Sequence, residues 1–197
     1  MRIMICIFSV ILMYCNNLSG QSGKKKEKII IRTEIGDILV SLDLKKAPVT
    51  SLNFLRYIDA NLFDNTCFYR VVRIDNQPND SVLIEVIQGG RYEEEDNGFP
   101  PIVHETTKMT GIRHRNGTIS MARTTPGSAT SEFFICIGDQ PELDFGGRRN
   151  PDRQGFAAFG RVIKRMDIVR RIHSIRSASQ YLEKPVLIKK IIRIADN

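Results

Sequence analysis

An arginine inside an apolar stretch is the first residue of the chain that could do chemistry. Arg70 stands between Tyr69 and Val71 in a run with strand character, where a guanidinium is costly to bury unless it faces a cleft or an ionic partner. In a cleft, it can donate hydrogen bonds to an atom that gains electron density during a reaction. Gln88 carries a donor and an acceptor, enough to hold Arg70 and a substrate carbonyl. The structural alternatives are an arginine paired with a carboxylate and an amide that caps the end of a strand.

Residues 117–136 contain two predicted strands and the loop that joins them. Residues 118–122 and 132–137 are rich in β-branched and aromatic side chains, which is typical of strands. The small residues between them, 124–131, turn at Pro126 and Gly127 and would let another chain approach the backbone closely. Because neighbours in a strand point to opposite faces, we expect one of Phe133 and Phe134 in the core and the other towards the loop. The alternative is an ordinary hairpin with a long tip.

Five segments, in order, resemble motifs of the cyclophilin-type peptidyl-prolyl isomerases. They are residues 47–54 (Ala-Pro-Val-Thr…Asn-Phe), 68–72 (Phe-Tyr-Arg-Val-Val), 86–90 (Val-Ile-Gln-Gly-Gly), 120–135 (Ser-Met-Ala…Ser-Glu-Phe-Phe-Ile) and 156–162 (Phe-Ala-Ala-Phe-Gly-Arg-Val). The resemblance extends from about residue 28 to the C-terminus. It implies a closed eight-stranded antiparallel β-barrel with an α-helix over each end, and catalysis of cis–trans isomerisation at X-Pro peptide bonds.

The chemistry of that reaction suits Arg70. Rotation of a peptide bond breaks amide resonance, with a barrier of about 18–20 kcal/mol, and returns a lone pair to the prolyl nitrogen. Arg70 can donate to that lone pair, so the reaction needs no nucleophile, metal or cofactor. The resemblance implies that the catalytic residues are Arg70 and Gln88. It also implies that the proline pocket and the backbone that pairs with the substrate are formed by Val86, Phe134, Leu143, Phe156, Ala122 and Arg123. Otherwise, such apolar residues are ordinary core.

Several of these positions depart from the family pattern. The family's Asn, Gln, Met, His and Trp are replaced by Arg123, Glu132, Val86, Phe156 and Glu142, and a Phe by Glu85 unless Ile84 takes its place. Residues 73–81 form a longer connection than the family has. Since the Trp closes one side of the cleft, we expect the Glu142 carboxylate at the pocket rim, where it would favour peptides with Lys or Arg near the proline.

The rest of the chain predicts many short strands and two helices, an all-β-dominated pattern for which a closed barrel removes exposed edges. The first helix begins at Pro48 and its apolar face is formed by Val49, Leu52, Leu55 and Ile58, widened by Phe54 and Tyr57. Met166, Val169, Ile172 and His173 mark the second helix. The further strands are expected at residues 29–33, 38–42, 66–72, 82–87, 155–162, 186–188 and 191–194, with Gly36 and Asp37 in the first turn.

Composition indicates one globular domain with few specialised sites. The net charge of +7 is spread along the chain, without the basic stripe and interleaved aromatics of a nucleic-acid interface. No Cys/His spacing suggests a metal, so His104, His114 and His173 are interpreted as surface or structural residues. Cys67 and Cys136 are interpreted as small buried hydrophobes, although a disulfide stays open. We expect no cofactor, no nucleic acid and a monomer.

The N-terminus predicts export. Met1 and Arg2 followed by the apolar run 3–15 are typical of a signal peptide, with small residues near 20 for cleavage. Cys15 leaves a lipoprotein open, which would attach the protein to a membrane, although Tyr14 is bulky for such a site. The expected organisation is a signal peptide (1–20), a polar linker (21–28) and an isomerase domain (29–197) in the periplasm or anchored to its membrane.

The hypothesis from sequence is therefore an exported isomerase of X-Pro bonds that acts on proline-containing peptides and unfolded polypeptides. Its rival is a non-catalytic peptide-binding or chaperone module on the same fold. Arg70 favours the enzyme, whereas the altered pocket favours the binder.

Overall fold

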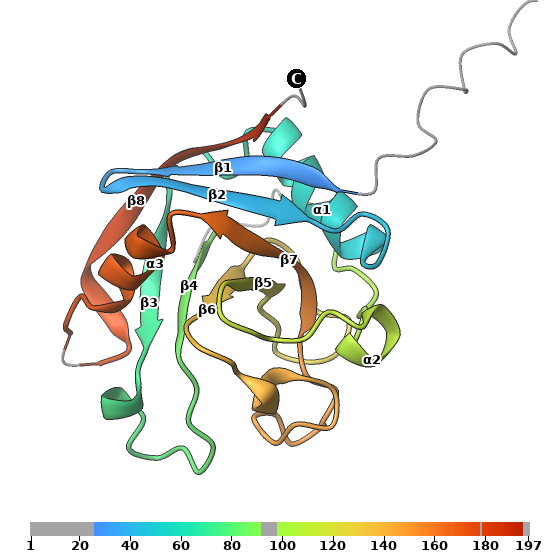
Figure 1. Cartoon of the computed structure of the whole chain (residues 1–197), viewed down its shortest axis with the longest axis vertical. Helices are drawn as coiled ribbons and strands as arrows, with labels where there is room; N and C mark the ends of the chain where they lie inside the picture. The colour runs from blue at the N-terminus through green and yellow to red at the C-terminus, as the bar shows by residue number, and fades with distance from the viewer. Residues whose placement is uncertain (1–25, 92–97, 178, 195–197) are drawn as a thin grey trace, which may run out of the picture.

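Eight antiparallel strands form a closed barrel (Figure 1). The structure is a computed structural model, and it describes residues 26–91, 98–177 and 179–194. Around the barrel, the strands follow the order β1-β2-β7-β5-β6-β4-β3-β8. Their bounds are β1 Glu27–Thr33, β2 Gly36–Leu42, β3 Thr66–Val72, β4 Val86–Gly90, β5 Thr118–Met121, β6 Phe133–Cys136, β7 Ala157–Lys164 and β8 Tyr181–Ile194. The prediction of a closed eight-stranded antiparallel barrel with two helices is confirmed.

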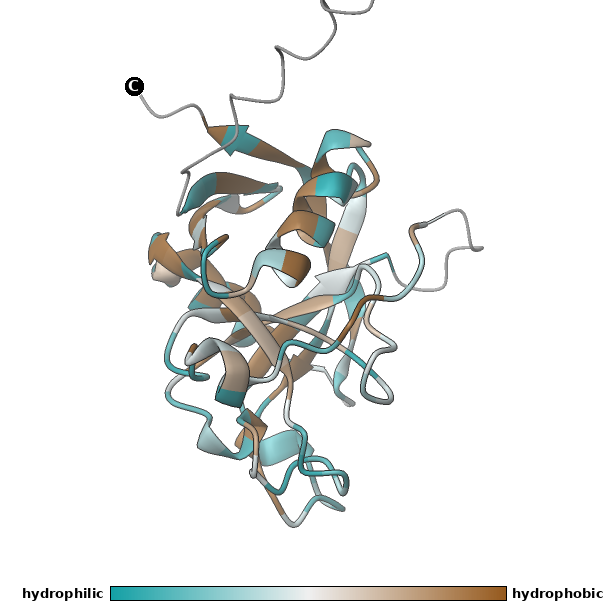
Figure 2. Ribbon diagram, turned by 90° about the vertical axis from the view of Figure 1, so that its right-hand side faces the viewer, coloured by the Kyte–Doolittle hydropathy of each residue, from teal (hydrophilic) through white to brown (hydrophobic). Residues whose placement is uncertain are grey.

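The helices pack on the barrel through apolar side chains. Helix α1 (Pro48–Asp59) contacts β7 and β8, and α3 (Met166–His173) contacts β2, β3 and β4. Phe54 of α1 lies 5.2 Å from the ring centroids of both Phe133 and Phe159, which joins the helix to the barrel core. The other helical segments are α2 (Thr107–Thr110) and the 3₁₀ turns η1 (Ile74–Asn76) and η2 (Pro141–Leu143). In Figure 2, hydrophobic residues are concentrated in strands and helices, and the loops at the lower end are mostly hydrophilic.

The predicted apolar face of α1 is partly wrong. Val49 and Leu52 are 40% and 50% exposed, while Thr50, Ser51 and Asn53 are buried beside Phe54 and Leu55. Burial of the polar residues is possible because they have partners. The Glu105 carboxylate accepts hydrogen bonds from the Thr50 backbone N–H (2.8 Å) and hydroxyl (2.7 Å). Asn53 donates to the Thr130 carbonyl (2.7 Å).

Four predicted strands also differ from the structure. Residues 82–85 are not in a strand, because the Gln77 side chain bonds both the N–H and the carbonyl of Ile84; β4 instead runs from Val86 to Gly90. The two closing strands are one strand, β8. The first strand, β1, begins at Glu27, within the expected linker. The turn between β1 and β2 is formed by Glu34 and Ile35, not by Gly36 and Asp37.

The cysteines are not bonded to each other. Cys67 on β3 and Cys136 on β6 are free thiols on strands separated by β4. Burial raises the pKa of both thiols. The segment expected to be a signal peptide and most of the expected linker lie outside the described residues. Within the described part of the chain, no helix is both long and apolar enough to cross a bilayer.

Candidate active site

A row of residues that crosses three neighbouring strands forms the floor of the site. The register pairs Arg70 on β3 with Gln88 on β4, and Gln88 with Phe134 on β6. Directly opposed residues share one face of a sheet. Phe133 belongs to the barrel core, so Phe134 and its row lie on the outer face, where loops cover them. The prediction that the two phenylalanines have different environments is confirmed.

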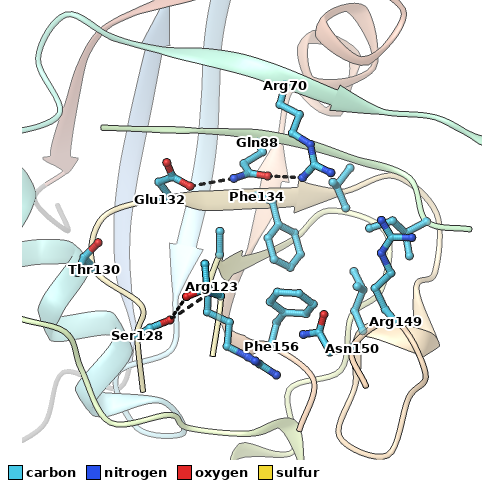
Figure 3. Close-up of a pocket in the computed structure, with 15 residues that line it drawn as sticks. Arg70, Gln88, Arg123, Ser128, Thr130, Glu132, Phe134, Arg149, Asn150 and Phe156 are labelled. Atoms are coloured by element: carbon cyan, nitrogen blue, oxygen red, sulfur yellow. Dashed lines mark hydrogen bonds between the residues drawn. The ribbon is translucent and has the colours of Figure 1, made fainter. Parts of the chain in front are cut away.

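Arg70 is held from both sides and aimed at the pocket (Figure 3). Its Nη1 donates to Gln88 Oε1 (2.7 Å), and its Nε donates to Gln180 Oε1 (3.0 Å), which also accepts from Nη2. A register shift between Phe68 and Arg70 interrupts both neighbouring ladders, a feature that re-aims a side chain. The other two guanidinium N–H groups have no hydrogen-bond partner among the described residues. Burial lowers the pKa of Arg70, yet an arginine remains protonated near neutral pH.

The pocket beside Arg70 is large enough for a proline and its neighbours. Its volume is about 510 Å³, within the range of small-ligand sites. Phe134 and Phe156 meet edge to face in it, with ring centroids 5.2 Å apart. All but one of the residues predicted to form the site line this pocket: Arg70, Gln88, Val86, Ala122, Arg123, Phe134, Leu143 and Phe156.

Glu142 is the exception, and its predicted place at the pocket rim is wrong. It is not among the lining residues. Its carboxylate accepts hydrogen bonds from the Arg148 backbone N–H (2.8 Å) and from Arg148 Nη2 (3.0 Å). These bonds from Arg148 lower the pKa of Glu142. The carboxylate is thus committed to its own loop, and the preference for basic peptides that we attributed to it loses its basis.

Arg123 lines the pocket without offering it a free charge. Its Nη1 and Nη2 donate to the two carboxylate oxygens of Asp152, each at 2.8 Å, and Nε donates to the Gly155 carbonyl (2.8 Å). The side chain is 1% exposed, and its guanidinium lies 5.2 Å from the centroid of the Phe156 ring. The hydrogen bonds from Arg123 lower the pKa of Asp152 to about 2. The pair therefore fixes the loop after β5 to the loop before β7.

Gln88 is committed to protein partners. Its Oε1 accepts from Arg70, and its Nε2 donates to Tyr69 Oη (2.6 Å) and to Glu132 Oε2 (3.0 Å). Both of its N–H groups are therefore occupied. The predicted hold on Arg70 is present, whereas the amide N–H groups are not free for a substrate carbonyl. Burial, and then the nearby Glu132 carboxylate, raise the pKa of Tyr69, so the phenol stays protonated.

A family model described as cyclophilin type peptidyl-prolyl cis-trans isomerase/CLD matches residues 28–193. The chain belongs to this family. Peptidyl-prolyl cis-trans isomerase A of Dickeya dadantii is 34% identical over 176 residues, which are 84% of this chain and 84% of that protein. A peptidyl-prolyl cis-trans isomerase of Acinetobacter baylyi is 35% identical over 160 residues, 79% of this chain and 77% of that one.

Solved structures support the fold of this cyclophilin. A crystal structure of a cyclophilin type peptidyl-prolyl cis-trans isomerase from Cryptosporidium parvum has a TM-score of 0.70 at 20% identity, over 87% of this chain and 99% of that one. A second crystal structure of that protein, in the presence of the dipeptide Ala-Pro, has a TM-score of 0.69 at 21% identity.

Sequence reasoning missed Gln180, the second residue that holds Arg70 in this cyclophilin. It lies 110 positions from Arg70 and carried no signal, because a polar residue before a strand is unremarkable in a sequence. The reasoning also did not assign Thr124, Ser128, Thr130, Arg149 or Asn150 to the pocket. Glu132 was noted only as a departure from the family, yet it lines the pocket as well.

We expect Gln180→Leu to lower kcat/KM for an X-Pro peptide by up to about 10²-fold, the scale for misplacing a catalytic group by about 1 Å. The side chain fixes Arg70, whereas the Gln180 backbone carbonyl accepts from the Val71 N–H (2.8 Å) and would continue to do so. A peptide isomerisation assay measures the loss. An unchanged rate in the folded variant would show that Gln88 alone is enough to position Arg70.

A buried histidine supports the pocket from behind. His114, 1% exposed, contacts Asp144 Oδ1 through Nδ1 (2.8 Å) and Ser120 Oγ through Nε2 (2.9 Å). Its ring stacks on Phe134 with centroids 5.8 Å apart, and Asp144 follows Leu143, another lining residue. Ser120 is fully buried, so this Ser-His-Asp cluster is closed to a substrate. Of the two interpretations offered for the histidines, the structural one applies to His114.

We expect this cluster to make stability pH-dependent. Burial lowers the pKa of His114 although Asp144 acts in the opposite direction. Burial alone would raise the pKa of Asp144, but its hydrogen bonds from His114 outweigh this and lower it. Below the ordinary histidine value of about 6.5, the unfolded state therefore binds more protons than the folded state, and stability falls as pH falls. Asp144 adds a loss of the same sign at lower pH.

Urea unfolding of the wild type and of His114→Gln between pH 7.5 and pH 5 measures this effect. The wild type should lose up to about 1.4 kcal/mol more per pH unit than the variant, the limit for one proton. Burial also lowers the pKa of His104, and the subtraction removes that contribution. Parallel curves for the two proteins would contradict the assignment to His114.

Proposed function

We propose that the chain catalyses the cis–trans isomerisation of X-Pro peptide bonds. One observation carries the proposal: Arg70 presents two N–H groups without a partner among the described residues, beside a pocket of about 510 Å³ with an apolar wall for the proline ring. In the twisted transition state, the prolyl nitrogen has a lone pair that the planar amide lacks. A donor that Gln88 and Gln180 already hold in place stabilises that state without reorganisation.

The pocket restrains the proline while the rest of the peptide turns. Phe134, Phe156, Val86 and Leu143 supply the apolar wall. The Ala122 N–H already donates to the Glu132 carbonyl (2.9 Å), whereas the backbone N–H and C=O of Arg123 have no partner among the described residues. The residues before the proline would pair with Arg123 as a short added strand. Gln88 acts as a positioning residue, because its amide groups hold Arg70, Tyr69 and Glu132.

A direct test is the exchange rate between the cis and trans forms of a short X-Pro peptide, measured by NMR at equilibrium. Uncatalysed exchange takes tens to hundreds of seconds, so catalysis is readily detected. The proposal requires faster exchange with the protein at substoichiometric amounts. A protein that binds the peptide without changing the rate would be the rival binding module.

We propose further that the protein is exported and works as a monomer in the periplasm or at its membrane. The support is the pattern of residues 1–20, a charged start and a short apolar run followed by small residues. Mass spectrometry of the protein from its native cells should give an N-terminus near Gln21, or a lipidated Cys15 if the lipoprotein alternative holds. An intact Met1 would contradict export in both forms.

A further inference from the structure

The pocket has a basic side that the isomerisation chemistry does not require. Figure 3 shows Arg149 and Asn150 on the opposite side of Phe134 and Phe156 from Glu132. Arg149 belongs to the loop after η2, and its side chain is 14% exposed. The neighbouring Arg148 has a side chain that is 67% exposed and is bonded to Glu142 outside the pocket. Of two consecutive arginines, one is therefore turned into the pocket.

Arg149 is fixed through one end of its guanidinium. Nη1 donates to the Val82 carbonyl (2.7 Å) and lies 3.1 Å from Asp80 Oδ2, both in the connection between β3 and β4. Nε and Nη2 have no hydrogen-bond partner among the described residues. A guanidinium that is immobilised by some of its donors while others stay free is preorganised for a planar acceptor such as a carboxylate.

Two residues near Arg149, Arg70 and Asn150, also have hydrogen-bond donors without a partner among the described residues. Burial lowers the pKa of Arg70, and the positive charge of Arg149 acts in the same direction, so the two guanidinium groups repel each other across the pocket. The Asp80 carboxylate acts in the opposite direction and offsets part of this repulsion. An anion between them would relieve this repulsion. Asn150 Nδ2 is buried without a hydrogen-bond partner among the described residues, which is costly unless a ligand supplies one.

The direction of the bound chain identifies the source of the anion. Figure 3 shows Arg123 and Arg149 on different sides of the Phe134 and Phe156 rings. If the residues before the proline pair with the Arg123 backbone, we expect the residues after it to leave the pocket on the Arg149 side. We infer that Arg149 and Asn150 bind a carboxylate that the substrate carries on the C-terminal side of its proline. This inference rests on the proposed isomerase function and predicts that the enzyme prefers X-Pro segments followed by Asp or Glu. On the other side, the Glu132 carboxylate disfavours an acidic residue before the proline.

Three blocked peptides test the inference: acetyl-Ala-Ala-Pro-Glu-Ala-amide, its Gln counterpart, and acetyl-Ala-Glu-Pro-Ala-Ala-amide. NMR exchange gives kcat/KM for each at low salt. We expect the peptide with Glu after proline to exceed its Gln counterpart by about three- to tenfold, between the scales of an exposed and a buried charge pair. The peptide with Glu before proline should show no gain in kcat/KM over the Gln peptide. Salt at 0.5 M should reduce the preference, because it screens charge.

Matched variants separate the contact from the general charge of the protein. Arg149→Gln should bring the Glu-to-Gln ratio close to one. Arg148→Gln removes the same charge one residue away, outside the pocket, and should leave the ratio unchanged. Arg149→Lys keeps the charge but loses the fork, and should retain part of the preference.

The outcomes distinguish this inference from the proposed function. If the Gln peptide is not accelerated at all, the isomerase proposal itself fails. If it is accelerated but the Glu peptide is no better, the inferred subsite is absent. The inference would also be overturned if the Glu-to-Gln ratio of kcat/KM were unchanged in Arg149→Gln, or if it fell equally in Arg148→Gln. A gain only for the peptide with Glu before proline would overturn it as well.

Discussion

Replacement of Arg70 by alanine should lower kcat/KM for X-Pro peptides by about 10²–10³, the measured scale for removing one preorganised donor. The variant loses the guanidinium that we propose as the donor to the prolyl nitrogen and leaves the apolar wall of the pocket in place. The loss corresponds to about 2.7–4 kcal/mol of transition-state stabilisation. Peptide binding should weaken less than turnover, because the donor acts mainly on the twisted amide.

Arg70→Lys is the informative control, since it preserves the charge but not the planar fork that Gln88 and Gln180 hold. We expect it to recover only a small part of the lost rate. Unfolding curves for each variant must show that the barrel is intact. Full activity in a folded Arg70→Ala protein would remove the mechanism proposed above.

Replacement of Phe133 by alanine should have the largest effect on stability, a loss of about 3–5 kcal/mol in the free energy of unfolding. Phe133 is fully buried. Its ring meets Phe54 and Phe68 edge to face, with centroids 5.2 Å and 5.7 Å apart, and lies 5.8 Å from Phe63. These contacts join β6 to α1, so alanine would leave a cavity where helix and barrel meet.

Denaturant unfolding measures this loss, and Phe133→Leu provides a milder version if the alanine variant does not fold. Phe134→Ala is the matched comparison, one residue along the same strand. It should reduce kcat/KM strongly, because it removes a wall of the pocket. A smaller loss of stability for Phe133→Ala than for Phe134→Ala would contradict the division between core and pocket.

Features set by local rules could be predicted from the sequence. Alternation along β6 placed Phe133 and Phe134 on opposite faces. The eight-stranded barrel was implied by the resemblance of five ordered motifs to the cyclophilins. Pro48 marked the start of α1 because a first-turn residue needs no N–H partner. The resemblance to the cyclophilins implied the apolar lining of the pocket, which Val86, Phe134, Leu143 and Phe156 form.

Features set by distant partners could not be predicted. Thr50 is buried only because Glu105, 55 positions away, binds it, so hydrophobic periodicity chose the wrong face of α1. Glu142 turns out of the pocket because Arg148 binds its carboxylate. Nothing in the sequence distinguishes Arg148 from Arg149, yet the fold points one to solvent and the other into the pocket.

The way the barrel closes has a consequence for the order of folding. β8, the last strand to be synthesised and 14 residues long, pairs with both β1 and β3. The pairing of β1 into the closed barrel therefore depends on the end of the chain. Until Tyr181–Ile194 arrives, β1 and β3 each have an unpaired edge and the core between them is open. Contacts between such distant parts of a chain form slowly. We therefore expect a nascent chain that ends before β8 to remain sensitive to protease and available to chaperones. A chain that crosses a membrane from its N-terminus should fold only after most of it has passed through.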